Sequence, residues 1–262
     1  SFGEARNLLE GIIKVKHGEH TYTNHATLGK KIRHLELTGL EEKDGTDKLG
    51  TFKEYEATYE LEEISSMKER EKAGTEIVPT AGIKVIASVK QYPDQNYVTF
   101  ELSFPNGLQD TSTGKYEEFI TSFPSFLNDS PNDEIFTYRH AIFCPPSRKG
   151  KATSAPMLLY DDDLNALLVS SLDNFLNAAV SYDKEDRIDC GIQGEITELP
   201  EGYSQKFIIL FGNGINGMFE QLGEVLRTYH DAEDFDPYYN VAVSHLSYWT
   251  DNGAYYYYQK EK

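Results

Sequence analysis

Hydrophobic and polar residues alternate along three stretches in the first half of the chain. Over 53–61, the aromatic and aliphatic residues at 55, 57, 59 and 61 alternate with Glu and Thr at 54, 56, 58 and 60. The same alternation recurs over 83–89 and 98–104. A period of two residues is typical of a strand with one buried and one solvated face. Because Pro93-Asp94 is a turn signal, the last two stretches are predicted to form an antiparallel hairpin.

Two other stretches of the first half have no regular period. The segment 65–74 is rich in Lys and Glu, which predicts either a short exposed helix or a loop. Residues 106–150 are punctuated by Asn, Asp, Ser, Pro and Gly. A long irregular segment of this kind predicts either binding loops or the ordered edge of a large sandwich.

Short apolar runs continue the strand series in the second half. The runs 158–160 and 166–169 flank three successive aspartates at 161–163, which predicts a turn between two strands. The runs 188–196 and 207–211 predict two further strands. With 18 Tyr and 14 Phe, the aromatic content also favours pleated, half-buried surfaces. Strands are therefore expected to dominate the fold.

One segment has the period of an amphipathic helix. Over 217–230, apolar residues recur at i, i+3, i+4 and i+7, and they line one face. The acidic, proline-containing segment 232–239 predicts a linker. The apolar residues 241–246 after it predict one more strand.

Charge and hydropathy exclude several classes of function. The 25 Lys and Arg against 43 Asp and Glu give a net charge of −18 over 262 residues. Nucleic acid is not an expected partner, because a phosphate backbone needs a basic stripe. The mean hydropathy is −0.54, and no apolar run approaches the roughly 20 residues that cross a bilayer. A soluble chain with no membrane partner is expected, and no signal-peptide pattern begins the sequence.

The two cysteines, Cys144 and Cys190, are too few for a disulfide framework or a zinc knuckle. A single disulfide bond between them, in a secreted protein, stays an open alternative. The single glycosylation sequon begins at Asn128, but Pro131 follows it and makes it a poor acceptor. The cysteine and sequon patterns therefore leave the compartment undecided.

Residues 212–217 match the pattern G-x-G-x-x-G between a predicted strand and a predicted helix. A dinucleotide site would need this context, together with an acidic residue at the end of the next strand. The acidic residues here fall in the linker, and further alternations of strand and helix are missing. The favoured interpretation is a tight turn whose glycines permit positive φ. The alternative, a dinucleotide-dependent enzyme, would require NAD to raise the melting temperature.

Metal and nucleophile patterns are weak. His17, His20 and His25 have a spacing that fits no zinc motif, so exposed or hydrogen-bonded histidines are favoured. The aspartates at 161–163 lack the alternating donors of a calcium loop. No G-x-S-x-G is present. No cofactor and no metal site are predicted.

Residues 247–258 combine aromatic and hydrogen-bonding side chains at the end of a predicted strand. Trp249 can stack on the apolar side of a sugar ring, and Asp251 and Asn252 can hydrogen-bond to its hydroxyls. Barrel enzymes hold their sites at strand ends of this kind. These three residues are therefore candidate substrate-binding residues. The alternative is an aromatic hairpin in which Gly253 only turns the chain.

The stretch 248–256, Tyr-Trp-Thr-Asp-Asn-Gly-Ala-Tyr-Tyr, resembles the first barrel strand and loop of the α-galactosidase and raffinose synthase group of retaining glycoside hydrolases. Three upstream stretches agree in order. Residues 168–175 resemble a sandwich strand and turn, 191–204 the final sandwich strands, and 212–223 the turn and helix that lead to the barrel. The resemblance covers roughly residues 155–258.

The resemblance implies a mainly β fold. It predicts a large antiparallel β-sandwich, or supersandwich, in 1–211, a connecting helix and linker in 212–239, and the first strand of an incomplete (β/α)₈ barrel in 240–262. A whole barrel takes about 250 residues. In the family both catalytic carboxylates are aspartates on later barrel strands. This chain is therefore expected to be inactive alone, with Asp251 in the position of a sugar-holding Asp.

The expected function is the N-terminal sandwich portion of a carbohydrate-active enzyme, acting by hydrolysis or glycosyl transfer with retention. The alternative is a non-catalytic carbohydrate-binding or β-rich interaction protein. Carbohydrate is the expected ligand. The apolar segment 241–246 is expected to be disordered, or to be covered by the rest of the barrel or by a second copy of the chain. A secreted or lysosomal setting is favoured.

Overall fold

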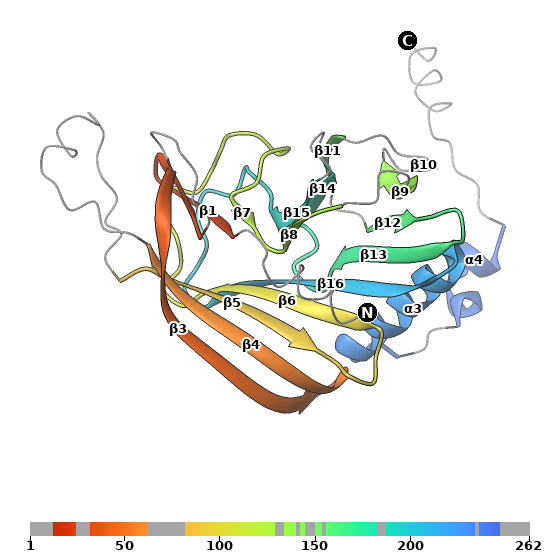
Figure 1. The fold of residues 1–262 in the computed structure, drawn as a ribbon. Coiled ribbons are helices and arrows are strands. Elements are labelled where there is room, and N and C mark those ends of the chain that lie inside the picture. The colour runs from red at the N-terminus through yellow and green to blue at the C-terminus, as the bar shows by residue number, and fades with distance from the viewer. Residues whose placement is uncertain are drawn as a thin grey trace, which may run out of the picture.

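The structure is a computed structural model that describes residues 13–24, 32–61, 82–128, 134–139, 142–144, 150–153, 156–182, 187–233 and 236–246. Strands make up most of it, with one long helix (Figure 1). The strands are β1 (Lys14–His17), β2 (His20–Thr23), β3 (Ile32–Asp47), β4 (Gly50–Leu61), β5 (Lys84–Gln91), β6 (Tyr97–Phe104), β7 (Thr121–Ser122), β8 (Ser125–Leu127), β9 (Glu134–Arg139), β10 (Ile142–Cys144), β11 (Gly150–Thr153), β12 (Met157–Tyr160), β13 (Asn165–Ser171), β14 (Ala178–Tyr182), β15 (Arg187–Ile192) and β16 (Tyr203–Asn213). The helices are α3 (Ile215–Tyr229), the 3₁₀ turn η1 (Pro237–Tyr239) and α4 (Val241–Ser244).

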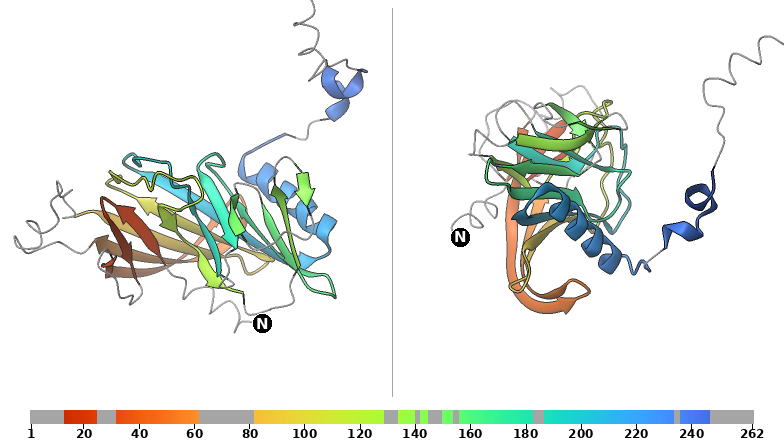
Figure 2. Two further views of the ribbon diagram at one scale, coloured as in Figure 1. Left: turned by 90° about the horizontal axis from the view of Figure 1, so that it is seen from above. Right: turned by 90° about the vertical axis from the view of Figure 1, so that its right-hand side faces the viewer.

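These strands form two sheets. The larger has the order β10-β9-β12-β13-β16-β6-β5-β4-β3-β2-β1-β7, and the smaller has the order β11-β14-β15-β8. Every pairing among the described strands is antiparallel except that of β2 with β3, which is parallel. The smaller sheet lies over one face of the larger sheet (Figures 1 and 2). The predicted β-sandwich is therefore confirmed.

The face of the large sheet that looks toward the small sheet is called the inner face. Phe100 of β6 lies opposite both Val89 of β5 and Phe207 of β16, so the three side chains share this face. They belong to a buried apolar cluster with Ile188 and Ile192 of the small sheet. The core of the sandwich thus fills the space between the two sheets.

The opposite face, called the helix face, carries α3. Leu222 and Val225 of the helix are buried together with Leu168 of β13 and with Ile208 and Leu210 of β16. The apolar stripe predicted for this segment is the stripe that packs on the sheet. β16 is therefore covered on both sides, which explains its run of successive apolar residues.

The β3–β4 hairpin extends past the small sheet and curves away from it (Figures 1 and 2). At its tip, Lys48 Nζ donates to the Tyr229 carbonyl at 3.3 Å and pairs with the Asp231 carboxylate, just after α3 ends. Most side chains of β4 are only partly buried, so the alternation of Tyr and Glu along this strand does not mark one fully dry face.

Several predicted elements are confirmed. β5 and β6 form the expected antiparallel hairpin, and β12 and β13 pair across the aspartate turn at 161–163. The predicted strand 188–196 ends earlier, at Ile192, and a turn follows at Gly194 and Glu195, where the Gln193 side chain accepts the backbone N–H of Glu195 at 2.7 Å. The segment 65–74 lies outside the described residues.

The strand predicted at 241–246 is wrong over Val241–Ser244, which form the single helical turn of α4. The Asn240 side chain accepts a hydrogen bond from the backbone N–H of Ala242 at 2.9 Å and so caps the turn. This local cap outweighs the strand preference of two valines. The barrel predicted for 240–262 stays a prediction, because residues 247–262 lie outside the described part of the chain.

Candidate functional site

The residues predicted to bind substrate, Trp249, Asp251 and Asn252, lie outside the described residues. Their role therefore stays a prediction. Within the described residues, two other features have the composition of a site. One is an open groove beside β4, and the other is a polar cluster on β16.

The groove lies on the inner face of the large sheet, beside the β3–β4 hairpin, and has a volume of about 470 Å³. Ala57 of β4 lies opposite Ala87 of β5, and these two small side chains form its floor. Tyr55 and Tyr59 follow at two residues on either side of Ala57, so they share its face. Leu40 of β3, opposite Ala57, forms a further wall. This feature is called the β4–β5 groove.

The other wall of the β4–β5 groove comes from the far end of the large sheet. Phe123, which follows β7, Ile13 and Asn24 contribute to this wall. The Asn24 Oδ1 accepts a hydrogen bond from the Ile13 backbone N–H at 2.8 Å, which fixes this end of the wall. Neither Tyr55 nor Tyr59 makes a hydroxyl hydrogen bond within the described residues. Their hydroxyls therefore remain available to a ligand.

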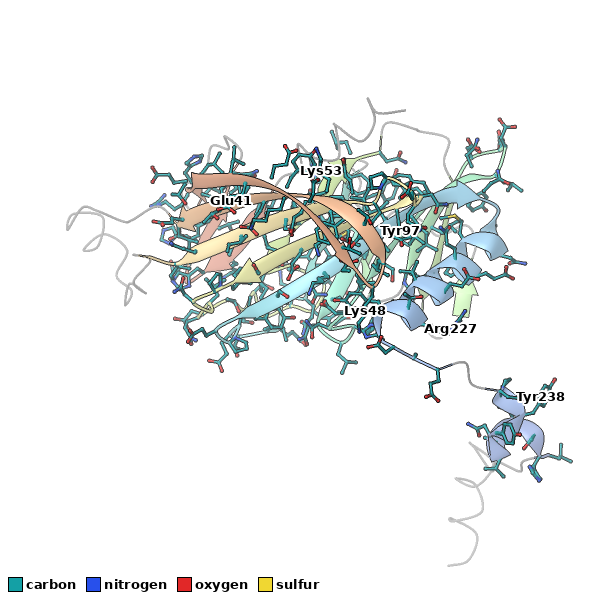
Figure 3. All side chains as sticks on the ribbon, turned by 90° about the horizontal axis from the view of Figure 1, so that it is seen from below. Glu41, Lys48, Lys53, Tyr97, Arg227 and Tyr238 are labelled. Carbon is teal, nitrogen blue, oxygen red and sulfur yellow. The ribbon has the colours of Figure 1, made fainter. Side chains whose placement is uncertain are left out.

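Glu41, Glu42 and Glu56 all contribute to the lining, but of these three only Glu42, which lies opposite Tyr55, has its side chain on the face of the groove, at its rim. Lys43 Nζ lies 3.0 Å from Glu41 and 3.3 Å from Glu56, and Lys53 Nζ lies 2.7 Å from Glu42. Figure 3 shows Glu41 and Lys53 on the β3–β4 hairpin. Hydrogen bonds to the glutamates raise the pKa of both lysines above the ordinary value. At the rim of the groove the Glu42 carboxylate is therefore paired with the Lys53 ammonium, whereas Glu41, Glu56 and Lys43 pair on the opposite face of the sheet.

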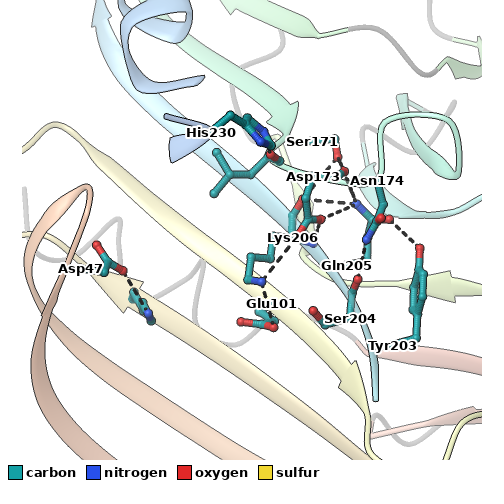
Figure 4. Close-up of polar contacts among 12 residues, drawn as sticks. Asp47, Glu101, Ser171, Asp173, Asn174, Tyr203, Ser204, Gln205, Lys206 and His230 are labelled. Carbon is teal, nitrogen blue, oxygen red and sulfur yellow. Dashed lines mark hydrogen bonds and ion pairs between the residues drawn. The ribbon is translucent and has the colours of Figure 1, made fainter. Parts of the chain in front are cut away.

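The polar cluster centres on Lys206 of β16 (Figure 4). Its Nζ lies 3.3 Å from Glu101 of β6 and 3.5 Å from Asp173 in the turn after β13. Asp173 Oδ1 also accepts the backbone N–H of Lys206 at 2.8 Å, and Gln205 Nε2 donates to the Asp173 carbonyl at 2.9 Å. The cluster thus ties the turn 171–174 to β16.

Electrostatics indicate a structural role for this cluster. Burial alone would lower the pKa of Lys206, but Glu101, Tyr229 and Asp173 together raise it above the ordinary value. Burial raises the pKa of Asp173, which shares its single cation with Glu101. The cavity beside them is about 30 Å³, which is room for about one water molecule. A substrate does not fit there, so the β4–β5 groove is the stronger candidate site.

The glycine-rich segment 212–217 is a turn between β16 and α3. Gly214 caps the helix with φ of 79°, and a Cβ at Gly212 would come within 2.6 Å of Met218 Sδ. β16 pairs antiparallel with both of its neighbours, whereas a dinucleotide fold places this motif after a strand of a parallel sheet. Gly214 thus has the positive φ that the favoured interpretation predicted, whereas Gly212 is required by the close approach of Met218.

The histidine and aspartate motifs have local structural partners. His17 is buried and lies opposite His20 in the β1–β2 hairpin, and its Nδ1 donates to the Gln109 carbonyl at 2.7 Å. His25 lies outside the described residues. The Asp161 carboxylate accepts backbone N–H groups of its own turn, and the Asn165 side chain lowers its pKa by hydrogen bonding. Among the described residues, no group of His, Cys, Asp or Glu is placed to hold a metal.

The thiol of Cys190 is free and buried, and burial raises its pKa. The side chain of Cys144 lies outside what the structure describes. No described helix is long and apolar enough to span a membrane.

Sequence reasoning missed the β4–β5 groove. It identified Tyr55, Ala57 and Tyr59 as one face of a strand, but assigned that face to the core. A signal was present, since the face carries alanines at 57 and 87 between larger residues. Only the pairing of β4 with β5 places those two alanines side by side.

No protein-family model and no curated protein matches the chain. Among solved structures, the GH36 α-galactosidase AgaA A355E from Geobacillus stearothermophilus, in complex with 1-deoxygalactonojirimycin, is similar over 82% of this chain at 13% identity, with a TM-score of 0.47. AgaB from the same organism is similar over 83% of this chain at 14% identity, also with a TM-score of 0.47. This chain spans 32% of the length of each of these two enzymes. A putative aldose 1-epimerase from Escherichia coli K12 is similar over 79% of this chain and 86% of its own, at 9% identity and a TM-score of 0.40. These are distant likenesses of fold.

Proposed function

We propose that this chain is the sandwich portion of a carbohydrate-active enzyme of the retaining type, whose catalytic carboxylates lie on barrel strands outside these 262 residues. One observation carries the proposal. Three stretches of the sequence resemble the α-galactosidase and raffinose synthase group, and each coincides with an element of the fold. The stretch 168–175 covers the end of β13 and its turn, 191–204 covers the end of β15 and the start of β16, and 212–223 covers the glycine turn into α3. These elements precede the stretch 248–256 in the order that the resemblance requires.

The exposed apolar residues after α3 also support a larger assembly. Tyr238, Tyr239, Val241, Val243 and Leu246 are all exposed, although they are large apolar or aromatic residues within ten positions. Figure 3 shows Tyr238 well away from the two sheets. A cluster of this kind is typical of a surface that packs on a partner. In the proposed enzyme, the partner is the remainder of the barrel.

In this proposal the chain contributes to substrate binding but not to bond cleavage. Trp249 stacks on the sugar ring, and Asp251 and Asn252 hydrogen-bond to its hydroxyls. The nucleophile and the acid/base are two carboxylates about 5 Å apart, supplied by later strands.

The proposal is tested by expressing the longest natural reading frame that contains this sequence and assaying it on raffinose and on an aryl α-galactoside. We expect hydrolysis or glycosyl transfer with retention of the anomeric configuration. NMR spectra of the first product measure that configuration. Asp251→Asn should lower kcat/KM by about tenfold or more, because a hydrogen bond to a charged group is worth about 1.5–3 kcal/mol. Asp162→Asn, in the exposed turn after β12, is the matched control.

Two results would contradict the proposal. One is a natural reading frame that ends at Lys262. The other is an active enzyme that Asp251→Asn and Asp162→Asn affect equally. The first result would favour the second candidate function, a non-catalytic carbohydrate-binding protein, for which the presence of the β4–β5 groove is the supporting observation.

A further inference from the structure

We propose that the β4–β5 groove binds a neutral oligosaccharide, through residues other than Trp249, Asp251 and Asn252. This inference goes beyond the proposed function, because nothing in the catalytic role of a barrel requires a site on the sandwich. It rests on the size of the groove, its position at the end of the covered core, the residues that line it, and the charges on its rim.

The groove has the dimensions of a ligand site. Its volume of about 470 Å³ lies within the roughly 300–1,000 Å³ usual for pockets that bind small molecules. Tyr55 and Tyr59 are four residues apart on one strand, which corresponds to about 13 Å. The groove is therefore an elongated depression along β4, with the Ala57–Ala87 floor between its two aromatic residues.

The groove begins where the small sheet no longer covers the inner face. Val85, Ala87 and Val89 of β5 are buried, whereas Leu40 of β3 is 72% exposed. The apolar surface of the core therefore continues outward onto the hairpin instead of ending at a polar edge. Exposed apolar surface bordered by polar residues is typical of a binding surface.

The lining residues fit a sugar. Aromatic rings offer an apolar surface for the C–H face of a pyranose, and the two tyrosine hydroxyls, which make no hydrogen bonds within the described residues, can donate and accept. Glu42 can accept from a sugar hydroxyl while it stays bound to Lys53, because a carboxylate has about four acceptor positions.

The charges of the rim argue for a neutral ligand. Glu42 pairs with Lys53 on the face of the groove, and Glu41 and Glu56 share Lys43 on the opposite face of the sheet. An anionic ligand would meet the Glu42 carboxylate, and a cationic ligand would have to displace the Lys53 ammonium that already neutralises it. A polyhydroxyl ligand needs neither change.

The test measures binding of neutral oligosaccharides to the full chain by saturation-transfer NMR and titration calorimetry. The probes are raffinose, maltohexaose, cellohexaose and mannohexaose. Ala57→Leu fills the floor of the groove, and Thr51→Leu places the same side chain at an exposed position of the same strand. At least one probe should bind with a Kd of about 1 mM or tighter, Ala57→Leu should weaken that binding at least about tenfold, and Thr51→Leu should change it less than about twofold.

Tyr55→Ala provides a second groove variant in case Ala57→Leu does not fold, and it should weaken binding to a similar extent. Three results would overturn the inference: no probe binds, both groove variants bind like the wild type, or Trp249→Ala abolishes binding while both groove variants retain it. The last result would leave the proposed function intact. A dimer seen by sedimentation that Ala57→Leu dissociates would also overturn it, because a second copy would then occupy the groove.

Discussion

The large sheet has a region covered on both faces, at β13 and β16, and a largely uncovered region, along the β3–β4 hairpin. In β16 four consecutive residues, 207–210, are buried, because the small sheet lies on one side and α3 on the other. In β4 nearly every side chain is only partly buried. The two regions share one continuous hydrogen-bonded ladder, so the strands alone do not determine which part is core.

The difference shows what each layer contributes. Pairing between strands satisfies backbone groups along the whole sheet, but burial of side chains follows only where a second layer is present. The hairpin therefore keeps alternating charges that stay in water, and its inner face is left as the β4–β5 groove. Stability is concentrated in the covered region, and a binding surface is available in the uncovered one.

The largest loss of stability is expected for Phe207→Ala, in the covered region. Phe207 is 1% exposed, between Phe100 and the small sheet. Truncation of a buried Phe to Ala costs about 3–5 kcal/mol, because packing is lost and a cavity remains. The free energy of unfolding, measured in urea, should fall by that amount.

The comparison variant is Leu40→Ala on the hairpin. Its side chain is mostly exposed, so the free energy of unfolding should change by less than about 0.5 kcal/mol. Similar losses for the two variants would show that the hairpin is as tightly covered as β16, and the distinction between the two regions would be wrong.

Gly191→Ala should have the next largest effect. A Cβ at this position of β15 would lie 1.9 Å from the Thr121 carbonyl oxygen, which belongs to the strand packed against it. Overpacking of this kind costs about 1–3 kcal/mol, since backbone has to shift. Gly39→Ala on β3 is the control, because its Cβ would meet Thr58 at an ordinary 3.6 Å. A melting temperature lowered equally by both substitutions would contradict the prediction.

The sequence predicted most strands but not their order in the sheet. Alternation and apolar runs depend on neighbouring residues, so β5, β6, β12 and β13 could be identified with their turns. The position of β16 between β13 and β6 could not, because its pairing with β6 joins segments about a hundred residues apart. The resemblance predicted the fold class, a β-sandwich. The order of the strands depends on long-range pairing, which the sequence pattern does not show.

The candidate site was harder to predict for the same reason. Tyr55 and Tyr59 were identified as a strand face, but Ala87 reaches the same floor from the next strand of the sheet. The helical turn at Val241–Ser244 shows a different limit. There the Asn240 side chain accepts the Ala242 N–H and caps a helical turn, and a pattern of apolar residues does not indicate this cap.

The smallest expected effect on the free energy of unfolding comes from the buried Tyr92 near the helix face, and it is seen only at alkaline pH. Burial raises the pKa of Tyr92, whose hydroxyl donates to Asp47 at 3.0 Å. Above pH of about 10 the unfolded chain loses this proton and the folded chain keeps it, so the folded state binds more protons and stability falls as pH rises. The free energy of unfolding should fall by about 1.4 kcal/mol per pH unit for this residue.

In Tyr92→Phe that contribution disappears, because phenylalanine has no proton to lose. Urea titrations at pH 8 and at pH 11 measure it, and an equal alkaline loss in wild type and variant would show that Tyr92 is not held protonated by the fold.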